Sequence, residues 1–315
     1  MRALYIKAYG GPDVMQMGEL PDPEPKRGEV LVAIKTSSIN PVDWKVRAGE
    51  LKFITGRAFP KTLGSDFAGV VERVGAAVAA PSVGERVYGT TPVMLRKPGA
   101  HAERLVVSAK RVRRMPDGLS FEHAAALPIA GLTALNGLRQ CGELQGKTVL
   151  INGATGGVGH FAVQIAKARG ATVTAVCSEG NAARAVSLGA DAVIDYRKHD
   201  FTSGSVRYDV VFDTFGHLKY PAVARALKDR GVLVTTLPVP ALIARSVWQK
   251  VIGGKQIMMG NLRDRPEDYA ELERLLAEGS VKPVIDKIVP LEEAVHAYAA
   301  LEAGGTVGKV VIRIA

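Results

Sequence analysis

The sequence predicts an α/β protein in which a doubly wound parallel sheet is joined to a second, mostly β domain. Two observations carry this prediction. Short strand-like runs broken by Gly and Pro fill the chain up to residue 115, and apolar strands alternate with helices beyond residue 117. Strands that are apolar throughout are typical of a parallel sheet with helices on both faces. The chain has 315 residues, a length that favours about two domains.

The first part of the chain is strand-rich. Runs such as EVLVAIKTSSI and FAGVVERVG alternate apolar and polar residues and are separated by turn residues, which is typical of half-buried strands. Between these runs, NPVDWKVRAGE contains Pro41 and is compatible with a helical turn. We therefore expect residues 1–120 to form a compact β domain.

The middle of the chain follows a βαβ rhythm. Ser120 is the expected N-cap of a helix that has Glu122 and His123 in its first turn. Strands then alternate with helices, and we expect a Rossmann-type domain over residues 121–265. The expected helices of this part cover residues 158–169, 181–188 and 220–228. We expect residues 266–315 to rejoin the first domain, because strand-rich sequence returns there.

Composition excludes several classes of partner. No apolar run reaches the roughly 18–20 residues that span a bilayer, and the first residues lack a leader's apolar segment. We therefore expect a cytoplasmic protein with no membrane partner. Cys141 and Cys177 lack metal-ligand spacing and are expected to stay reduced.

The net charge of +10 raises the question of a nucleic-acid partner. One basic run covers residues 110–114, but no aromatic residues interleave with its charges. A solvated strand edge or an interdomain face explains this run better than an RNA surface does. The positive charge would also attract a phosphate-rich cofactor.

The strongest single motif is a glycine-rich turn between a strand and a helix. TVLING is followed by Ala-Thr-Gly-Gly-Val-Gly and then by an amphipathic helix, which is the context that a dinucleotide fingerprint requires. Gly156 would let the backbone approach a pyrophosphate, Gly159 would let the helix approach the strand, and the helix start would present free N–H groups. The candidate cofactor residues of this turn are Thr155, Gly156, Gly157, Val158 and Gly159.

The end of the next strand predicts which dinucleotide is bound. An NAD site usually has Asp or Glu there for the ribose 2′-OH, but this strand ends Ala-Val-Cys-Ser at Ser178. A neutral end leaves room for a 2′-phosphate, with Ser178 as donor and Arg184 as cationic partner, so NADPH is favoured over NADH. Two alternatives stay open: Glu179 takes the ribose role if the strand is one residue longer, and Arg184 is a solvated helix residue.

Several motifs together resemble one family. In chain order they are SINPVDWKVRAGE, LGSDFAGVVERVG, VGERVYG, AALPIAGLTAL, GATGGVGHFAVQIAKARGA, LGADAVIDY and GKVVI. The chain resembles the zinc-free, quinone oxidoreductase-like branch of the medium-chain dehydrogenase/reductase superfamily. Within that branch it looks most like the relatives of reticulon-4-interacting protein and the chloroplast-envelope quinone oxidoreductase-like proteins. The resemblance implies a GroES-like β domain completed by the C-terminal tail, a Rossmann domain, an active site in the cleft and a homodimer.

The resemblance also implies roles for single residues. Ser178 and Tyr196 would contact the 2′-phosphate or the adenosine, although Tyr196 is alternatively a strand-end aromatic residue that covers the sheet edge. The pyrophosphate would be held by Thr155, Gly157 and Val158. The residues near the cofactor beyond later strands would be Thr214, Leu237 and Lys309.

The catalytic zinc ligands of related alcohol dehydrogenases are replaced at the matching positions. Their Cys, His and second Cys align with Asn40, Ser65 and Ile129, and the acid beside their histidine aligns with Asp66. Asn, Ser and Ile offer neither thiolate nor imidazole, so a tetrahedral zinc site would be poor. Residues 90–105 contain no cysteine, so the structural zinc lobe is missing as well. We expect no bound metal.

Without zinc, the expected acceptor is one that takes a hydride readily, such as a quinone or an α,β-unsaturated carbonyl. Asn40 would hydrogen-bond the acceptor oxygen or the nicotinamide ribose, and Thr133 would line the nicotinamide pocket. Asp66 would position other groups while solvent supplies the proton, and Asp43 is alternatively a local cap. The predicted substrate pocket consists of Asp43, Trp44, Phe53, Ser65 and Asp66.

Two other functions stay open. One is an NADPH-binding protein with a non-catalytic or RNA-binding role, which would rest on the charge of +10. The other is a zinc alcohol dehydrogenase. The apolar and basic segment 238–254 would form a dimer face, a pocket lid or both.

Overall fold

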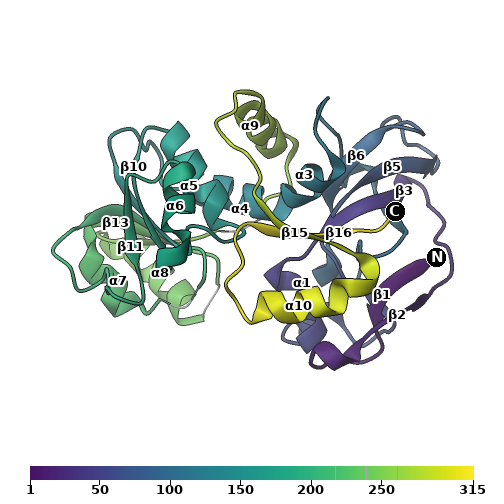
Figure 1. Ribbon diagram of the computed structural model, residues 1–315, viewed down its shortest axis with the longest axis horizontal. Coiled ribbons are helices and arrows are strands. Elements are labelled where there is room, and N and C mark those ends of the chain that lie inside the picture. Colours follow the sequence, from purple (N-terminus) through teal and green to yellow (C-terminus); the bar gives the residue numbers. More distant parts are fainter. Residues whose placement is uncertain (217, 238–239, 261) are drawn as a thin grey trace. The chain divides into compact units, whose positions relative to one another are not determined.

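The computed structural model describes residues 1–216, 218–237, 240–260 and 262–315. It consists of two compact units. The first unit holds Met1–Ile129 together with Val284–Ala315, and the second holds Ala130–Pro283. In Figure 1 the yellow C-terminal strands β15 (Ile285–Pro290) and β16 (Lys309–Arg313) lie beside the purple strand β3 (Glu29–Ser38) of the first unit.

The main sheet of the first unit joins both ends of the chain. Its strand order is β15–β16–β3–β5–β6–β8, and β7 pairs with β3 as well. β16 runs antiparallel to β3, with Val311 opposite Ser38, so the last strand lies beside the end of β3. The other strands of this sheet are β5 (Asp66–Val74), β6 (Arg86–Thr90), β7 (Arg104–Ser108) and β8 (Val112–Arg114). A smaller antiparallel sheet has the order β2–β1–β4, with bounds Met15–Glu19, Arg2–Ile6 and Lys61–Thr62.

Alternation along the strands builds the core of this unit. Val30, Val32 and Ile34 of β3 are buried and belong to one apolar cluster with Phe67 and Val71 of β5. Because successive strand residues point to opposite faces, these positions share one face of the sheet. Each such side chain contributes about 1.5–3 kcal/mol when it is fully removed from water.

The helices of the first unit begin and end at recognisable signals. α1 (Pro41–Ala48) starts with a proline, whose fixed φ suits the first helical position, and ends at Gly49 in the left-handed region. α3 (Phe121–Ala126) begins after Ser120, whose Oγ accepts from the N–H of His123 at 3.2 Å. The predicted N-cap is therefore confirmed. The other α-helices of this unit are α2 (Lys52–Thr55) and α10 (Ala294–Glu302).

The second unit contains a parallel sheet of six strands in the order β11–β10–β9–β12–β13–β14. This is the 3-2-1-4-5-6 order of a doubly wound Rossmann sheet. The predicted fold class is confirmed. The strands are β9 (Thr148–Asn152), β10 (Thr172–Cys177), β11 (Ala192–Asp195), β12 (Tyr208–Asp213), β13 (Leu227–Thr235) and β14 (Gln256–Met259).

The helices of this unit agree with the expected rhythm, with one difference. They are α4 (Pro128–Arg139), α5 (Gly159–Ala168), α6 (Ala182–Ser187), α7 (Tyr220–Ala226), α8 (Pro240–Ile252) and α9 (Pro266–Ala277). The helix expected over 220–228 ends at Ala226, because Leu227 already pairs with Tyr208 in the sheet and is buried in its core. Tertiary pairing therefore overrides the helical preference of this segment. In the described part of the chain, no helix has both the length and the apolar character of a bilayer span.

Candidate functional site

The glycine-rich turn of the second unit lies between β9 and α5. Gly153 follows β9 with a φ of 75°, and the N–H groups of Gly153 and Ala154 both bond to the carbonyl oxygen of Val176 at 3.1 Å. A Cβ at Gly159 would lie 2.0 Å from the Gly153 carbonyl oxygen, so only glycine fits where the helix begins. Among the described residues, that same oxygen is the one atom within 4 Å of a would-be Cβ at Gly156, at 3.3 Å. The turn is therefore a tight backbone cradle that fits a dinucleotide pyrophosphate.

The end of β10 brings two of the predicted residues together. β10 ends at Cys177, and the N–H of Tyr196 donates to the Cys177 carbonyl oxygen at 3.3 Å. Tyr196 therefore lies next to the strand end that Ser178 follows. Tyr196 is 56% exposed, and the guanidinium of Arg197 lies 5.7 Å from its ring centroid.

Glu179 lies beyond β10, in the short helix η4 (Glu179–Asn181). Its carboxylate pairs with Lys198 at 2.8 Å, but both side chains are exposed, and such pairs contribute little. Arg184 is exposed on α6. Arg197 and Lys198 also lie at this strand end; they were not predicted from the sequence, where the basic pair directly after Tyr196 is their only signal.

The end of β12 carries a buried acid that sequence analysis also missed. Asp213 accepts from Asn152 Nδ2 at 2.9 Å and from the N–H groups of Phe215, Gly216 and Leu218 at 3.0–3.2 Å. It thereby fixes the loop that contains the predicted residue Thr214. An Asp at the last position of a strand, in FDTFG, is the signal that could have found it.

Thr214 and Leu237 lie at the same edge of the sheet as the glycine turn. Thr214 Oγ1 donates to the Asn152 carbonyl oxygen at 2.7 Å and would lie 2.8 Å from a Cβ at Gly153. Leu237 N donates to Thr235 Oγ1 at 3.3 Å, directly after β13. The structure thus brings Thr155–Gly159, Ser178, Tyr196, Thr214 and Leu237 to the carboxyl edge of one parallel sheet, where such folds bind ligands.

In the first unit, Asn40 is the centre of a buried polar network. Its Nδ2 donates to Asp66 Oδ2 at 2.8 Å and makes a longer contact of 3.4 Å with the Ser38 carbonyl oxygen. Its Oδ1 accepts from Lys309 Nζ at 2.5 Å. Lys309 also donates to the Ile39 carbonyl oxygen at 3.1 Å. The network therefore joins β16 to the residues that connect β3 and α1.

Asp66, the acceptor of the Asn40 amide, makes further bonds within this network. Its Oδ2 also accepts from Ser38 Oγ at 2.8 Å and lies 3.7 Å from Lys309 Nζ, while its Oδ1 accepts from Ile129 N at 3.0 Å. Burial raises the pKa of the Asp66 carboxyl, and Lys309 and these hydrogen bonds oppose that rise. Burial likewise lowers the pKa of Lys309, against the attraction of the carboxylates.

Asp43 forms a second branch of the network with Ser65. Ser65 Oγ donates to Asp43 Oδ1 at 2.5 Å, and the N–H of Asn40 donates to Asp43 Oδ2 at 2.8 Å. Burial raises the pKa of Asp43 to about 7, against the opposing effect of these bonds. Asp43 therefore caps α1, which was the alternative left open for it, and also carries a proton more readily than an exposed acid.

A third branch reaches His101 and Tyr298, which sequence analysis left out of the site. His101 Nδ1 bonds with Ser37 Oγ and its Nε2 with the Tyr298 hydroxyl, both at 2.9 Å. Burial, and then Lys309, lower the pKa of His101 to about 3, so the ring is neutral. No local sequence signal links these residues, because β3, the loop before β7 and α10 are far apart in the chain.

The positions that match zinc ligands gather around Asp66, but they do not fit a zinc ion. Asn40 and Ser65 use their polar atoms within the network, and Ile129 contributes only its backbone N–H. Among the described residues, no group of three His, Cys, Asp or Glu side chains is placed to hold a metal ion. An amide, a hydroxyl and an alkyl side chain are a donor set that zinc does not favour.

The remaining predicted residues are not joined to this network by described bonds. Thr133 is buried on α4. Trp44 is half-buried and packs against the apolar core of the first unit, whereas Phe53 is 90% exposed on α2. In segment 238–254, Pro238 and Val239 lie outside the described residues.

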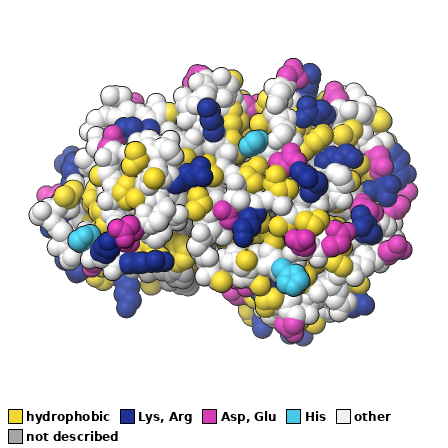
Figure 2. All heavy atoms as spheres, in the orientation of Figure 1, with side chains coloured by type: hydrophobic (Ala, Val, Ile, Leu, Met, Phe, Trp, Pro, Cys, Tyr) yellow, Lys and Arg dark blue, Asp and Glu magenta, His cyan; other side chains and the backbone are white. Residues whose placement is uncertain are grey.

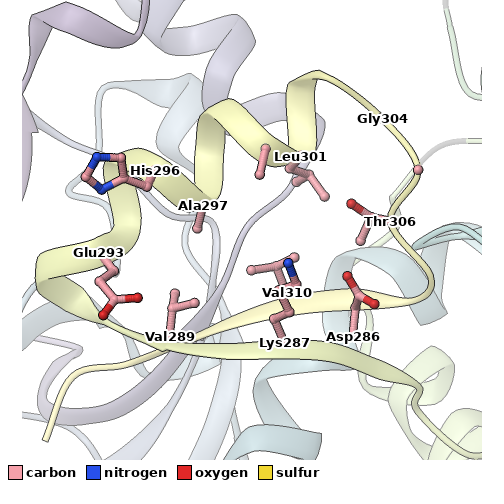
Figure 3. A pocket seen from close by; sticks show the side chains of 12 residues that line it. Asp286, Lys287, Val289, Glu293, His296, Ala297, Leu301, Gly304, Thr306 and Val310 are labelled. Atoms are coloured by element: carbon pink, nitrogen blue, oxygen red, sulfur yellow. The ribbon is translucent and has the colours of Figure 1, made fainter.

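A separate pocket of about 380 Å³ lies in the first unit. Figure 3 shows side chains of α10, among them His296, Ala297 and Leu301, on one side of it and those of β15 on the other. None of the predicted site residues lines it.

The basic run 110–114 is partly occupied by local contacts. Arg113 Nη1 donates to the carbonyl oxygens of Lys110 and Val112 at 2.9 Å, and Arg114 lies 3.7 Å from Asp117. On the face seen in Figure 2, Lys and Arg side chains are interspersed with Asp and Glu. This face therefore does not present a surface of a single charge.

The chain matches two protein families. Residues 26–117 match the alcohol dehydrogenase GroES-like domain, and residues 188–312 match the family described as zinc-binding dehydrogenase.

Similar proteins match almost the full length. The chloroplast envelope quinone oxidoreductase homolog of Arabidopsis thaliana is 33% identical over 99% of this chain and 98% of its own length. The 2-methylene-furan-3-one reductase of Solanum lycopersicum is 36% identical over 99% of this chain and 79% of its own length.

Solved structures of similar proteins have the same fold over nearly the whole chain. The quinone oxidoreductase from Coxiella burnetii superimposes with a TM-score of 0.91 at 32% identity, covering 100% of this chain and 99% of that one. Mycobacterial Rv1454c complexed with NADPH gives a TM-score of 0.86 at 28% identity, covering 100% of both chains. The chain therefore belongs to the quinone oxidoreductase-like branch of the medium-chain dehydrogenase/reductase superfamily, a family of pyridine nucleotide-dependent oxidoreductases.

Proposed function

We propose that this protein is an NADPH-dependent, zinc-independent reductase that transfers hydride to a quinone or an α,β-unsaturated carbonyl. The observation that carries the proposal is the bonding of the Asn40 side chain. Asn40 lies where related alcohol dehydrogenases have a zinc-binding cysteine, and its amide is hydrogen-bonded to Asp66 and Lys309. With no donor set for a Lewis-acidic metal, simple alcohols and ketones are poor substrates, whereas quinones and enones are electrophilic on their own.

The cofactor edge of the second unit supports a dinucleotide with a 2′-phosphate. Thr155 and Gly156–Gly159 would hold the pyrophosphate at the start of α5, and Ser178 and Tyr196 would lie at the adenosine end. β10 ends at Cys177, two residues before Glu179, which supports a neutral strand end over the strand-end acid that NAD sites use. Arg184, Arg197 and Lys198 would supply positive charge for the phosphate. A neighbour complexed with NADPH supports this choice, although another neighbour is an NAD-dependent alcohol dehydrogenase.

When bound, the nicotinamide supplies the hydride. The protein's part is to position the acceptor and to exclude water. One N–H of Asn40 is committed to Asp66 at 2.8 Å, but the other makes only the long contact of 3.4 Å with Ser38. We assign this second N–H to the acceptor oxygen or the nicotinamide ribose. Thr133 would line the nicotinamide pocket, and Thr214 and Leu237 would lie beside the cofactor.

Asp66 and Lys309 act through Asn40 in this proposal. Asp66 accepts from Asn40 Nδ2, and Lys309 donates to its Oδ1, so together they fix the plane of the amide. Both are positioning residues, and the proton that completes the reduction comes from solvent. Trp44 would form an apolar wall for the acceptor, whereas Phe53, predicted beside it, is 90% exposed on α2 and is not assigned to the pocket.

The acceptor class is supported by what similar proteins are named for. They include a 2-methylene-furan-3-one reductase, an NADPH-dependent alkenal/one oxidoreductase and several quinone oxidoreductases. The direct test is the rate of NADPH consumption with 9,10-phenanthrenequinone, 1,4-benzoquinone and a small enone. Turnover of at least one acceptor is expected. Tight NADPH binding without turnover of any of them would contradict the enzyme and favour a binding role.

We also propose that the protein acts in the cytoplasm as a homodimer. Cys141 and Cys177 are both buried free thiols, which is typical of a reducing compartment. Gel filtration with light scattering should give twice the chain mass. A single chain mass at micromolar concentration would contradict the dimer.

A further inference from the structure

Two short segments of the first unit expose apolar side chains next to each other. α2 (Lys52–Thr55) contacts η2 (Val93–Leu95), and Arg96 Nε donates to the Ile54 carbonyl oxygen at 3.2 Å. The exposed side chains are Phe53, Ile54, Met94 and Leu95. Single exposed apolar residues are ordinary, but a contiguous group marks an interaction surface.

Exposed cations lie in α2 and directly after both segments. They are Lys52 of α2, Arg57 after α2, and Arg96 and Lys97 after η2. Residues 51–65 and 86–102 contain no Asp or Glu at all, and within the described chain none of the four cations has a carboxylate in ion-pair distance. We refer to these four cations and the four apolar residues as the α2–η2 patch. It combines an apolar centre with four cations that form no ion pair within the described chain.

Hydrogen bonds of Thr55 and Arg96 anchor the α2–η2 patch. Thr55, at the end of α2, is buried; its Oγ1 bonds with the Tyr9 hydroxyl at 2.6 Å, and its carbonyl oxygen accepts from Lys61 Nζ at 2.9 Å. Arg96 adopts a φ of 60°, a conformation that is costly for a residue other than glycine. Its bond to Ile54 holds it there. The exposure of Phe53 and Leu95 is therefore part of an anchored structure.

We propose that the α2–η2 patch binds the surface of an anionic lipid bilayer. Aliphatic and aromatic side chains enter the boundary between headgroups and acyl chains, while flanking Lys and Arg meet the anionic headgroups. The α2–η2 patch contains both the apolar side chains and the flanking cations that such binding requires. This surface binding departs from the expectation of no membrane partner, which rested on continuous apolar runs. The patch instead comes from two segments that are separate in the sequence.

Other occupants fit the patch less well. A symmetric contact with a second copy would place the same four cations against each other, which is repulsive. Single-stranded nucleic acid needs aromatic side chains for stacking, and Phe53 is the one aromatic residue of the patch.

The test is co-sedimentation of the full-length protein with lipid vesicles, without NADPH or quinone, so that its outcome is independent of the proposed reaction. Vesicles of phosphatidylcholine mixed with phosphatidylglycerol should bind the protein at low salt. Phosphatidylcholine alone should bind it far less, and high salt should weaken the anionic binding.

Two variants test the two parts of the patch. Lys97→Glu should weaken vesicle binding by roughly tenfold or more, because each charge near the surface contributes about fivefold. Leu95→Ser should weaken it several-fold through the apolar part. The matched controls are Arg230→Glu and Val206→Ser, which make similar changes at exposed positions of the second unit. All four should keep the wild-type melting temperature and NADPH affinity.

Several results would overturn the proposal. Absence of binding to anionic vesicles at low salt is the first. Equal loss of binding in the controls and in the patch variants is the second. Two further results would assign the patch to another occupant. If Leu95→Ser abolishes self-association but leaves vesicle binding unchanged, the patch binds a second copy of the chain. If the protein does not bind vesicles but binds single-stranded RNA through the patch, the partner is RNA.

Discussion

Lys309 Nζ donates to Asn40 Oδ1 at 2.5 Å, and this bond ties the last strand of the chain to the residue before α1. Both side chains are buried. Lys309 therefore fixes the amide of Asn40 inside the first unit, with Asp66 on the other side of the same amide. The resemblance had placed Lys309 near the cofactor. Its described partners within the protein are Ile39, Asn40 and Asp66.

The variant Lys309→Met should be strongly destabilised. It removes the cation beside Asp66 and leaves a buried carboxylate without a charged partner, which costs about 3–5 kcal/mol. Lys309→Arg retains the charge and should lose less. The free energy of unfolding in urea, followed by circular dichroism, measures both. A methionine variant as stable as the wild type would show that the pair does not stabilise the fold.

The buried carboxyl of Asp43 should make stability depend on pH. Its pKa in the folded protein is about 7, above the ordinary value of 3.8, so folding favours its protonated form. The stabilisation is complete below pH 4 and is lost as the pH rises through 7, by an amount on the order of 4 kcal/mol. The charged or titratable groups that influence it are Asp66, Lys309 and Tyr298.

Asp43→Asn isolates this effect, because the amide cannot titrate and still accepts from the N–H of Asn40. The variant has to be compared with the wild type because His101 affects stability in the opposite direction. The pKa of His101 is lowered to about 3, so its contribution to the free energy of unfolding is lost as the pH falls below its ordinary value of 6.5. Free energies of unfolding from pH 4 to pH 8 should decline less with pH in the variant. Parallel curves for the two proteins would contradict the raised pKa.

Ser178→Asp should reverse the cofactor preference. A carboxylate at the end of β10 repels a 2′-phosphate and can bind a ribose 2′-OH. We expect NADPH affinity to fall roughly 100-fold and NADH affinity to rise. Ser203→Asp, at an exposed turn of the same unit, is the control. Fluorescence titration with both cofactors measures the effect, and an equal change for NADPH and NADH would place the 2′-phosphate elsewhere.

Asp213→Asn should weaken both cofactors equally. Asp213 holds three backbone N–H groups of the loop after β12, and the loss of part of this set should cost roughly tenfold in affinity. Asp209→Asn is a matched control at the opposite end of β12, where the acid bonds with Thr148 and Lys228. The control should lose stability without losing cofactor affinity. Unchanged NADPH affinity in Asp213→Asn would remove Asp213 from the site.

Local patterns were enough to predict the second unit from its sequence. The glycine turn and the apolar strands are short-range signals, because each depends on neighbouring residues. The helix over 220–228 was predicted too long, since Leu227 is committed to β13 by its pairing with Tyr208. That pairing depends on the position of β12 in the sheet, which the local sequence around Leu227 does not reveal.

The network of the first unit could be predicted only in part. Asn40, Asp43, Ser65 and Asp66 were identified by comparison with zinc-ligand positions, and the structure joins them through short hydrogen bonds. Their partner Lys309 lies 269 residues from Asn40 in the sequence, so only the pairing of β16 with β3 reveals the contact. His101 and Tyr298 were missed for the same reason.

The measurement that tests the central claim most directly is quinone reduction by metal-depleted protein. The protein would be treated with a strong chelator, checked for zinc by elemental analysis and assayed for NADPH consumption with 1,4-benzoquinone. The expected result is full activity without zinc and no gain when zinc is added back, because Asn40, Ser65 and Ile129 offer no zinc site. Loss of activity on chelation that added zinc restores would contradict the proposal.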